Sequence, residues 1–238
     1  MARLARYFLP NQPLHVIHRG KGGHRLFYSA KDYANYRDWL AEAAGKYGCV
    51  IHAYVLMPDH IHLLATPKAA DSLPRTLQSV GRRHVRAINA ARKREGTMWE
   101  GRYRAAPIEA GLHLLACQRY IELNPVREGL TRLPGRYSWS SYAAHAEGAA
   151  DKILTDHPLH RALGTTPAGR QRAYAALFKR ALDPAFVAAL RSATNGGWAL
   201  GSERFKARIT ALTGRRSTPL PKGRPRKKTT SKPRKARG

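Results

Sequence analysis

The chain has 238 residues, enough for one well-buried domain of roughly 150 residues and a further segment. It carries 43 Lys and Arg against 15 Asp and Glu, a formal charge of +28, and 32 of the basic residues precede position 215. A folded body this basic repels itself unless a polyanion neutralises it, so nucleic acid is the expected partner and an anionic membrane surface the competing one.

The distribution of apolar residues argues against a membrane-spanning or a secreted protein. No stretch approaches about 18 consecutive apolar residues, and the N-terminus lacks an apolar signal core. We therefore expect a soluble cytoplasmic protein without a membrane partner. Cys49 and Cys117 have no metal-type spacing and are expected to be reduced and buried.

The first third of the chain predicts a strand, a helix and a β-hairpin. Residues 14–18 alternate between apolar and polar side chains and read as a strand. Apolar side chains three and four residues apart predict a helix from about residue 29 to residue 47. Residues 49–57 and 60–66 predict two further strands, because the Pro-Asp pair between them marks a reversal.

The next segment predicts a long helix over residues 72–93, a strand over 101–108 and a helix over 109–123, closed by Asn124 and Pro125. The first six elements follow the order of a split β-α-β, ferredoxin-like antiparallel sheet with two helices on one face. The fold class is therefore α+β. The last helix is an addition that can lie across the sheet.

Beyond this core, the aromatic-rich segment 137–142 is expected to pack back on the body. Residues 151–214 read as short helices, and from Arg215 onward the composition cannot build a core. The expected division is one domain over residues 1–148, a helical region over 149–214 and a disordered basic tail over 215–238.

His60 and His62 form the first candidate site. Alternate side chains of a strand share a face, so the two imidazoles point the same way, about 7 Å apart along the strand. Two such histidines are half of a metal site. The competing interpretation is that they line a solvated face.

Tyr120 and Asn124 form the second candidate site, because residues four apart share one side of a helix. A tyrosine can attack a phosphodiester to form a covalent intermediate, and a divalent ion would polarise the phosphate. The Asn124 amide oxygen would complete a ligand triad with the histidines for octahedral Mg²⁺ or Mn²⁺. Alternatively, Tyr120 is an ordinary helix residue and Asn124 a C-terminal cap.

Candidate DNA contacts are basic side chains in three places. The long helix has an unusually basic outer face with few acidic residues to balance it, although such a face is commonly only solvated. The other candidates follow this helix, or lie in a tail segment that resembles an AT-hook for A·T-rich duplex, where nonspecific phosphate contact is the alternative. The residues are Arg82, Arg83, Arg86, Arg102, Arg104, Arg127, Lys222, Arg224 and Arg226.

Two motifs together carry a family resemblance. Residues 54–64 read YVLMPDHIHLL and residues 120–130 read YIELNPVREGL. With the segments 98–103 (MWEGRY) and 137–142 (YSWSSY), they resemble the HUH single-tyrosine transposases, and within these the bacterial REP-associated tyrosine transposases. The resemblance covers about residues 5–145.

The resemblance implies a ferredoxin-like nuclease core, Mg²⁺ or Mn²⁺, and a nucleoid-associated enzyme acting on single-stranded DNA beside REP-like hairpins through a 5′-phosphotyrosine link. It implies that His60 and His62 bind the metal, that Tyr120 is the nucleophile, and that Asn124 is the third ligand. Glu122 departs from the histidine often found between the Tyr and Asn positions, and we expect it to point away from the site.

Two other functions are compatible with the same sequence. A noncatalytic nucleic-acid-binding module can use a ferredoxin-like sheet, but such a sheet shows exposed aromatic side chains where this chain has histidines. A repressor derived from the enzyme would retain the site. The sequence does not distinguish a monomer from a homodimer.

Overall fold

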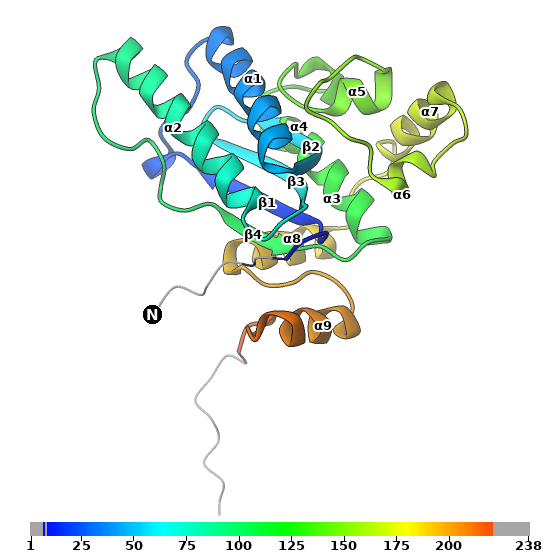
Figure 1. Cartoon of the computed structure of the whole chain (residues 1–238). Coiled ribbons are helices and arrows are strands. Elements are labelled where there is room, and N and C mark those ends of the chain that lie inside the picture. Colours follow the sequence, from blue (N-terminus) through cyan, green and yellow to red (C-terminus); the bar gives the residue numbers. More distant parts are fainter. Residues whose placement is uncertain (1–6, 8, 221–238) are drawn as a thin grey trace, which may run out of the picture.

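A four-stranded antiparallel sheet forms the centre of the computed structural model, which describes residue 7 and residues 9–220 (Figure 1). The strands lie in the order β2-β3-β1-β4, which is the ferredoxin-like order. This confirms the predicted α+β fold. The strands are β1 (Leu14–Arg19), β2 (Cys49–Leu56), β3 (His60–Pro67) and β4 (Arg104–Pro107).

Two long helices cover one face of the sheet: α1 (Ala30–Tyr47) and α2 (Ser72–Arg92) (Figure 1). The start of α1 is fixed by a capping box in which Ser29 accepts from the Asp32 amide and the Asp32 carboxylate accepts from the Ser29 amide. Its end is fixed by Gly48, which adopts the left-handed conformation (φ 67°) that glycine reaches without strain.

The opposite face is covered by α3 (Leu112–Glu122) and α8 (Pro184–Gly196). The sequence predicted that this helix closes at Asn124 and Pro125, and α3 does end at Glu122, but it did not predict the further helical turn that follows. The chain continues into α4 (Asn124–Arg127), with Leu123 as the joint at φ −82°, ψ −5°. Proline is tolerated there because the first turn of a helix does not use its amide hydrogens.

Because both faces of the sheet are covered, alternate residues of β3 enter two separate cores. Ile61 and Leu63 pack towards α1 and α2, whereas Leu64 packs towards α3 and α8. His60 and His62 share the alternation of Leu64, so their imidazoles face the α3 and α8 side. The fold thus directs both histidines into the layer that carries Tyr120.

The C-terminal half is packed against the sheet rather than appended to it. The bridges Val55–Ser140, Ile51–Leu154 and Ile108–Leu200 join it to β2 and to the end of β4, and the segment 137–142 packs on the body as predicted. The remaining helices are α5 (Tyr142–Glu147), α6 (Pro158–Arg161), α7 (Pro167–Leu177) and α9 (Glu203–Thr213), with 3₁₀ turns at Lys21–Gly23 and Pro134–Arg136.

The predicted tail boundary at residue 215 is too early. Ser217 is buried, its carbonyl accepts from the Ala199 amide at 2.9 Å, and its hydroxyl bonds to the Lys206 carbonyl. Residues 215–217 therefore close over α9. The AT-hook-like segment 221–228 lies outside the described residues.

Two predictions from the apolar residues can be compared with the fold. Cys49 and Cys117 are both buried and neither is in a disulfide among the described residues. Over the same part of the chain, no helix has the length and apolar character needed to span a membrane.

We predict that the α1–α2 core carries much of the stability. Leu63→Ala should lower the free energy of unfolding by about 2–5 kcal/mol, since Leu63 is fully buried and its removal leaves a cavity. Leu212→Ala makes the same chemical change at a side chain that is 66% exposed and should cost far less. Urea unfolding of both variants measures the difference, and equal losses would contradict this assignment of the core.

Candidate metal and nucleophile site

The four residues singled out in the sequence meet in one cavity of about 130 Å³. His60 and His62 come from β3, Tyr120 from α3 and Asn124 from α4. The rings of His60 and His62 are 5.0 Å apart between centroids, and Tyr120 presents its ring edge-on to His62 at 5.8 Å. The other lining residues are His15, Ile17, Arg19, Glu128, Arg191, Thr194 and Asn195.

The carboxylate of Asp59 fixes the hydrogen on His60. Asp59 Oδ1 lies 2.7 Å from His60 Nδ1, and this hydrogen bond lowers the pKa of Asp59. Because a carboxylate can only accept, Nδ1 carries the hydrogen and Nε2 keeps its lone pair. His60 Nε2 faces the cavity, 3.2 Å from Asn124 Nδ2 and 3.6 Å from Glu128 Oε1.

A chain of hydrogen bonds from α8 fixes the hydrogen on His62 in the same way. The Thr194 hydroxyl donates to the Leu190 carbonyl at 2.8 Å, so it accepts from His15 Nδ1 at 2.7 Å. His15 Nε2 must then accept from His62 Nδ1 at 2.9 Å. This leaves the lone pair of His62 at Nε2.

Burial keeps His15 and His62, the two imidazoles in this series of hydrogen bonds, neutral. It lowers the pKa of His15 to about 3 and, together with neighbouring His15 and His60, holds the pKa of His62 well below its usual range. Neutral imidazole is the form that binds a metal ion.

The donor set fits a divalent ion. Two imidazole nitrogens meet a carboxylate at Glu128 and the Asn124 amide, whose nitrogen here donates to His60 Nε2 and whose oxygen would be the ligand. Nitrogen and oxygen donors of this kind suit Mn²⁺ and Mg²⁺. Both histidines also have an outer hydrogen-bond partner that fixes the ring, as metal-binding histidines usually do. Asp59 and Glu128 also have carboxylate oxygens within 4.8 Å of each other and of a ring nitrogen of His60, so two carboxylates lie beside this imidazole.

Tyr120 is surrounded by positive charge. The Arg191 Nε donates to the Tyr120 hydroxyl at 3.4 Å, and the Arg127 guanidinium lies over the ring, 4.3 Å from its centroid. Both groups stabilise negative charge on the phenol oxygen, and with Arg19 they make the cavity suitable for a phosphate.

Of the described basic residues that were predicted to contact DNA, Arg127 is the one that lies over the Tyr120 ring. Arg82, Arg83 and Arg86 are on α2, in the layer on the other side of the sheet, and Arg83 is paired with Glu42 at 2.6 Å. Arg102 and Arg104 are exposed near β4, where Arg104 contacts Asn195. Lys222, Arg224 and Arg226 lie outside the described residues.

Sequence reasoning missed the residues that support the site. Glu128 stands four residues after Asn124, within the quoted motif, and this spacing was the available signal. His15 lies in a strand with the right alternation, but its position beside His62 depends on strand pairing. Arg191 and Thr194 belong to α8, in the region to which no function was assigned.

We predict that Thr194 controls metal affinity through His15. Thr194→Val should weaken Mn²⁺ binding about 10–100-fold, because His15 loses its acceptor and no longer fixes the His62 ring. Thr76→Val is the matched control: Thr76 is equally buried and its hydroxyl donates to the Ser72 carbonyl at 2.8 Å, far from the cavity. Calorimetric titration with Mn²⁺ measures the affinity of both variants. Equal affinities would refute a role for the hydrogen bonds from Thr194 through His15 to His62.

Comparison with known proteins agrees with this geometry. Residues 9–124 match the model of a family described as "Transposase IS200 like". No curated protein matches the chain. A solved structure of a REP-associated tyrosine transposase bound to a REP hairpin is similar with a TM-score of 0.54 at 17% identity, covering 66% of this chain and 93% of that one. A putative transposase from Deinococcus radiodurans has 24% identity over 51% of this chain and 96% of its own, with a TM-score of 0.36.

The first of these solved structures shares the fold, and the family match spans the sheet, α1, α2, α3 and the cavity residues up to Asn124. By this match residues 9–124, just under half of the chain, resemble the IS200-like transposases.

Proposed function

We propose that the protein is a metal-dependent single-stranded DNA endonuclease and strand transferase that forms a 5′-phosphotyrosine intermediate at Tyr120. The observation that carries this proposal is the convergence of Tyr120 with His60, His62 and Asn124 in one cavity lined by arginines. A phenol hydroxyl, a donor set for Mg²⁺ or Mn²⁺ and cationic side chains are the parts that phosphodiester cleavage requires.

Each side chain has a defined task in this mechanism. Tyr120 Oη attacks the phosphorus, the new Tyr–O–P bond forms, and the bond from phosphorus to the 3′ oxygen of the preceding nucleotide breaks. The Tyr120 hydroxyl loses its proton to solvent on attack, and the 3′ oxygen takes up a proton as it leaves, so the protons balance. His60, His62 and Asn124 would hold a divalent ion, which polarises the phosphate when it is bound.

The arginines stabilise the charge that develops during attack. Arg191 already donates to the Tyr120 hydroxyl, and Arg127 lies over its ring. Both would remain close to the phosphate once it is linked to Tyr120. Because one phosphate ester replaces another, the free energy of the reaction is close to zero. The 3′ hydroxyl of a second strand can therefore attack the phosphotyrosine and join that strand to the DNA.

The DNA partner is proposed to be single-stranded DNA that bears a hairpin. A similar fold has been solved with a REP hairpin bound, and the basic charge of this chain suits a nucleic acid. We propose both this DNA partner and, as its consequence, a place at the bacterial nucleoid.

A binding module that uses the open face of a ferredoxin-like sheet is disfavoured. Such modules stack bases on exposed aromatics of the sheet. Among the described residues, α1 and α2 cover one face here, α3 and α8 cover the other, and Tyr54 of β2 is fully buried.

We predict that Tyr120→Phe abolishes the covalent adduct and leaves DNA affinity within about twofold, since only the hydroxyl is removed. The measurement is a denaturing gel of labelled hairpin-bearing single strands incubated with Mg²⁺. Tyr103→Phe is a matched control, because Tyr103 is a buried tyrosine that lies outside the cavity lining. An adduct in Tyr120→Phe that maps by mass spectrometry to another residue would overturn the assignment.

The metal requirement gives a separate prediction. His60→Ala and His62→Ala should each lower Mg²⁺- or Mn²⁺-dependent cleavage by at least 100-fold, because each removes a ligand. Asn124→Ala should have a similar or milder effect. His24→Ala, at an exposed histidine, is the control. Full cleavage in excess chelator would contradict a metal role.

The tail should act on binding rather than on chemistry. Residues 221–238 contain nine basic residues and no acidic ones. Their deletion should weaken DNA binding at low salt and flatten the dependence of log affinity on log salt, with cleavage at saturating DNA unchanged. A greater loss on A·T-rich than on G·C-rich flanking duplex would support the AT-hook interpretation, and an unchanged slope would mean that the tail does not contact DNA.

A further inference from the structure

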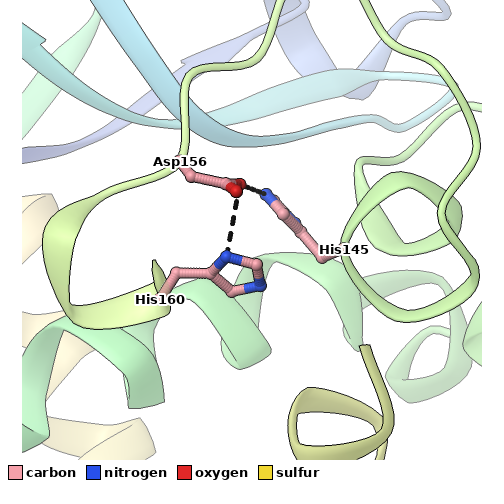
Figure 2. A group of neighbouring side chains, drawn as sticks. All are labelled: His145, Asp156 and His160. Carbon is pink, nitrogen blue, oxygen red and sulfur yellow. Dashed lines mark ion pairs between the residues drawn. The ribbon is translucent and has the colours of Figure 1, made fainter. Parts of the chain in front are cut away.

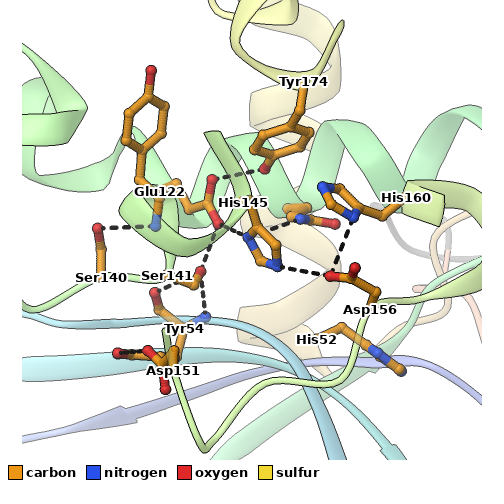
Figure 3. A network of polar contacts seen from close by, with 12 residues as sticks. His52, Tyr54, Glu122, Ser140, Ser141, His145, Asp151, Asp156, His160 and Tyr174 are labelled. Carbon is orange, nitrogen blue, oxygen red and sulfur yellow. Dashed lines mark hydrogen bonds and ion pairs between the residues drawn. The ribbon is translucent and has the colours of Figure 1, made fainter. Parts of the chain in front are cut away.

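A second polar cluster lies on the side of α3 that faces away from the cavity. Tyr120 and Glu122 are two residues apart on α3, so they point in directions about 200° apart. The Glu122 side chain enters a space between α3, α5, α6 and α7, together with His145, Asp156 and His160 (Figure 3). Glu122 therefore points away from Tyr120, as expected, and lies among the side chains of this second cluster.

The carboxylate of Glu122 is fully buried and accepts three hydrogen bonds. Ser141 Oγ donates at 2.5 Å, His145 Nδ1 at 2.6 Å and the Tyr174 hydroxyl at 2.7 Å. A carboxylate oxygen accepts hydrogen bonds and has no hydrogen to donate. It therefore requires the hydrogen of His145 to be on Nδ1.

This arrangement leaves the other nitrogen of His145 without a partner. With the hydrogen on Nδ1, the lone pair of His145 is at Nε2, which is buried and has no hydrogen-bond partner in the described part of the chain. It faces Asp156 Oδ1 at 3.8 Å (Figure 2). The Nε2 lone pair and the Asp156 oxygen are both acceptors, so they cannot form a hydrogen bond with each other.

His160 presents the same problem from the other side. Its Nδ1 lies 3.2 Å from the same Asp156 oxygen, but neither ring nitrogen has a hydrogen bond of good geometry within residues 9–220. Burial, and then the neighbouring His145, lower the pKa of His160, which favours its neutral form. A hydrogen on His160 Nδ1 would serve Asp156 and leave the His145 lone pair unsatisfied.

We infer that His145, Asp156 and His160 form a second metal site, distinct from the catalytic cavity, which binds a transition-metal ion of the Zn²⁺ type. Two imidazoles and one carboxylate are a common set of three protein ligands for Zn²⁺, which leaves its fourth position to water. The three ligand atoms lie within 4.8 Å of one another. Bonds of about 2.0 Å in a tetrahedral site place ligand atoms about 3.3 Å apart, close to the 3.2 Å and 3.8 Å found here.

The surroundings of the cluster provide an outer shell and an entrance. Glu122 holds the His145 ring through Nδ1, as outer carboxylates do for metal-binding histidines. The side chains of His145 and His160 are 2% and 4% exposed, whereas that of Asp156 is 35% exposed. An ion can therefore enter beside Asp156, where water would complete the coordination.

The site joins segments that are far apart in the sequence. Glu122 is on α3, His145 on α5 and His160 on α6, while Asp156 follows the bridge from Leu154 to β2. A bound ion would cross-link these segments only in the folded chain, and would thereby stabilise it. It would also hold the far side of α3, the helix that positions Tyr120.

Zn²⁺ binding to the full-length chain tests the inference once the catalytic cavity has been disabled. In a His60→Ala/His62→Ala background freed of metal, we expect one Zn²⁺ per chain by mass spectrometry of the metal content. Zn²⁺ at about 100 times its Kd should raise the Tm by about 5–10 °C. Co²⁺ in place of Zn²⁺ should give the visible absorption of a four-coordinate site.

Added substitutions identify the ligands. Asp156→Asn changes little in shape at a partly exposed residue and should weaken Zn²⁺ at least tenfold, as should His160→Ala. Glu122→Gln should weaken Zn²⁺ about 10–100-fold, because it removes only the outer carboxylate. His24→Ala, at an exposed histidine outside the cluster, should leave binding unchanged.

Two results would overturn the site. If the His60→Ala/His62→Ala background binds no Zn²⁺, the cluster is a hydrogen-bonded one in which a protonated His145 bridges Glu122 and Asp156. If Asp156→Asn, still folded by circular dichroism, keeps the full Zn²⁺ affinity, the ion is bound elsewhere. Neither result bears on the Tyr120 adduct, which is measured with Mg²⁺ in the chain with His60 and His62 intact.

Discussion

The position of β3 inside the sheet is the constraint on which the site depends. β3 pairs with β2 on one side and with β1 on the other, and helices cover both of its faces. Its residues must therefore alternate between two buried layers. A slip of one residue would place Ile61 and Leu63 in the cavity and two imidazoles in the apolar core beneath α1 and α2, which is strongly unfavourable.

Burying three imidazoles on one side of the sheet is stable only because each has a partner. Asp59 accepts from His60, His15 accepts from His62, and Thr194 accepts from His15. The last of these links comes from α8, so the C-terminal region supplies part of the site. The family match ends at residue 124, and the support for its histidines lies about 70 residues farther along the chain.

Most of the fold was predictable because its information is local. Apolar periodicity and turn residues define the strands and α1 to α3 within a few residues, and their order restricts the sheet to a familiar topology. His60, His62, Tyr120 and Asn124 were predictable from alternation and helical spacing. The role of His15 was not, because it depends on the register of β1 against β3, in which Ile17 lies opposite His62.

Other features escaped prediction for physical reasons that differ. The turn of α4 forms despite Pro125 because the proline lies where amide hydrogens are unused. Residues 215–217 close over α9 through a few specific contacts, among them the buried Ser217, in a segment whose composition is that of a disordered tail. Composition averages over a segment and does not detect a single buried contact.

The helix α3 connects two polar centres of opposite kind. On one side Tyr120 is surrounded by guanidinium groups, and on the other Glu122 is a buried carboxylate that three donors hold. A helix clamped on its far side cannot rotate without breaking those bonds, so the direction of the Tyr120 hydroxyl depends on Glu122 although the two never touch. Glu122, which lies between Tyr120 and Asn124 in the sequence, is the residue that fixes the helix. An in-line attack needs the reacting oxygen placed within a fraction of an ångström. A rigid far side of α3 is thus as much a condition for the chemistry proposed at Tyr120 as the cavity itself.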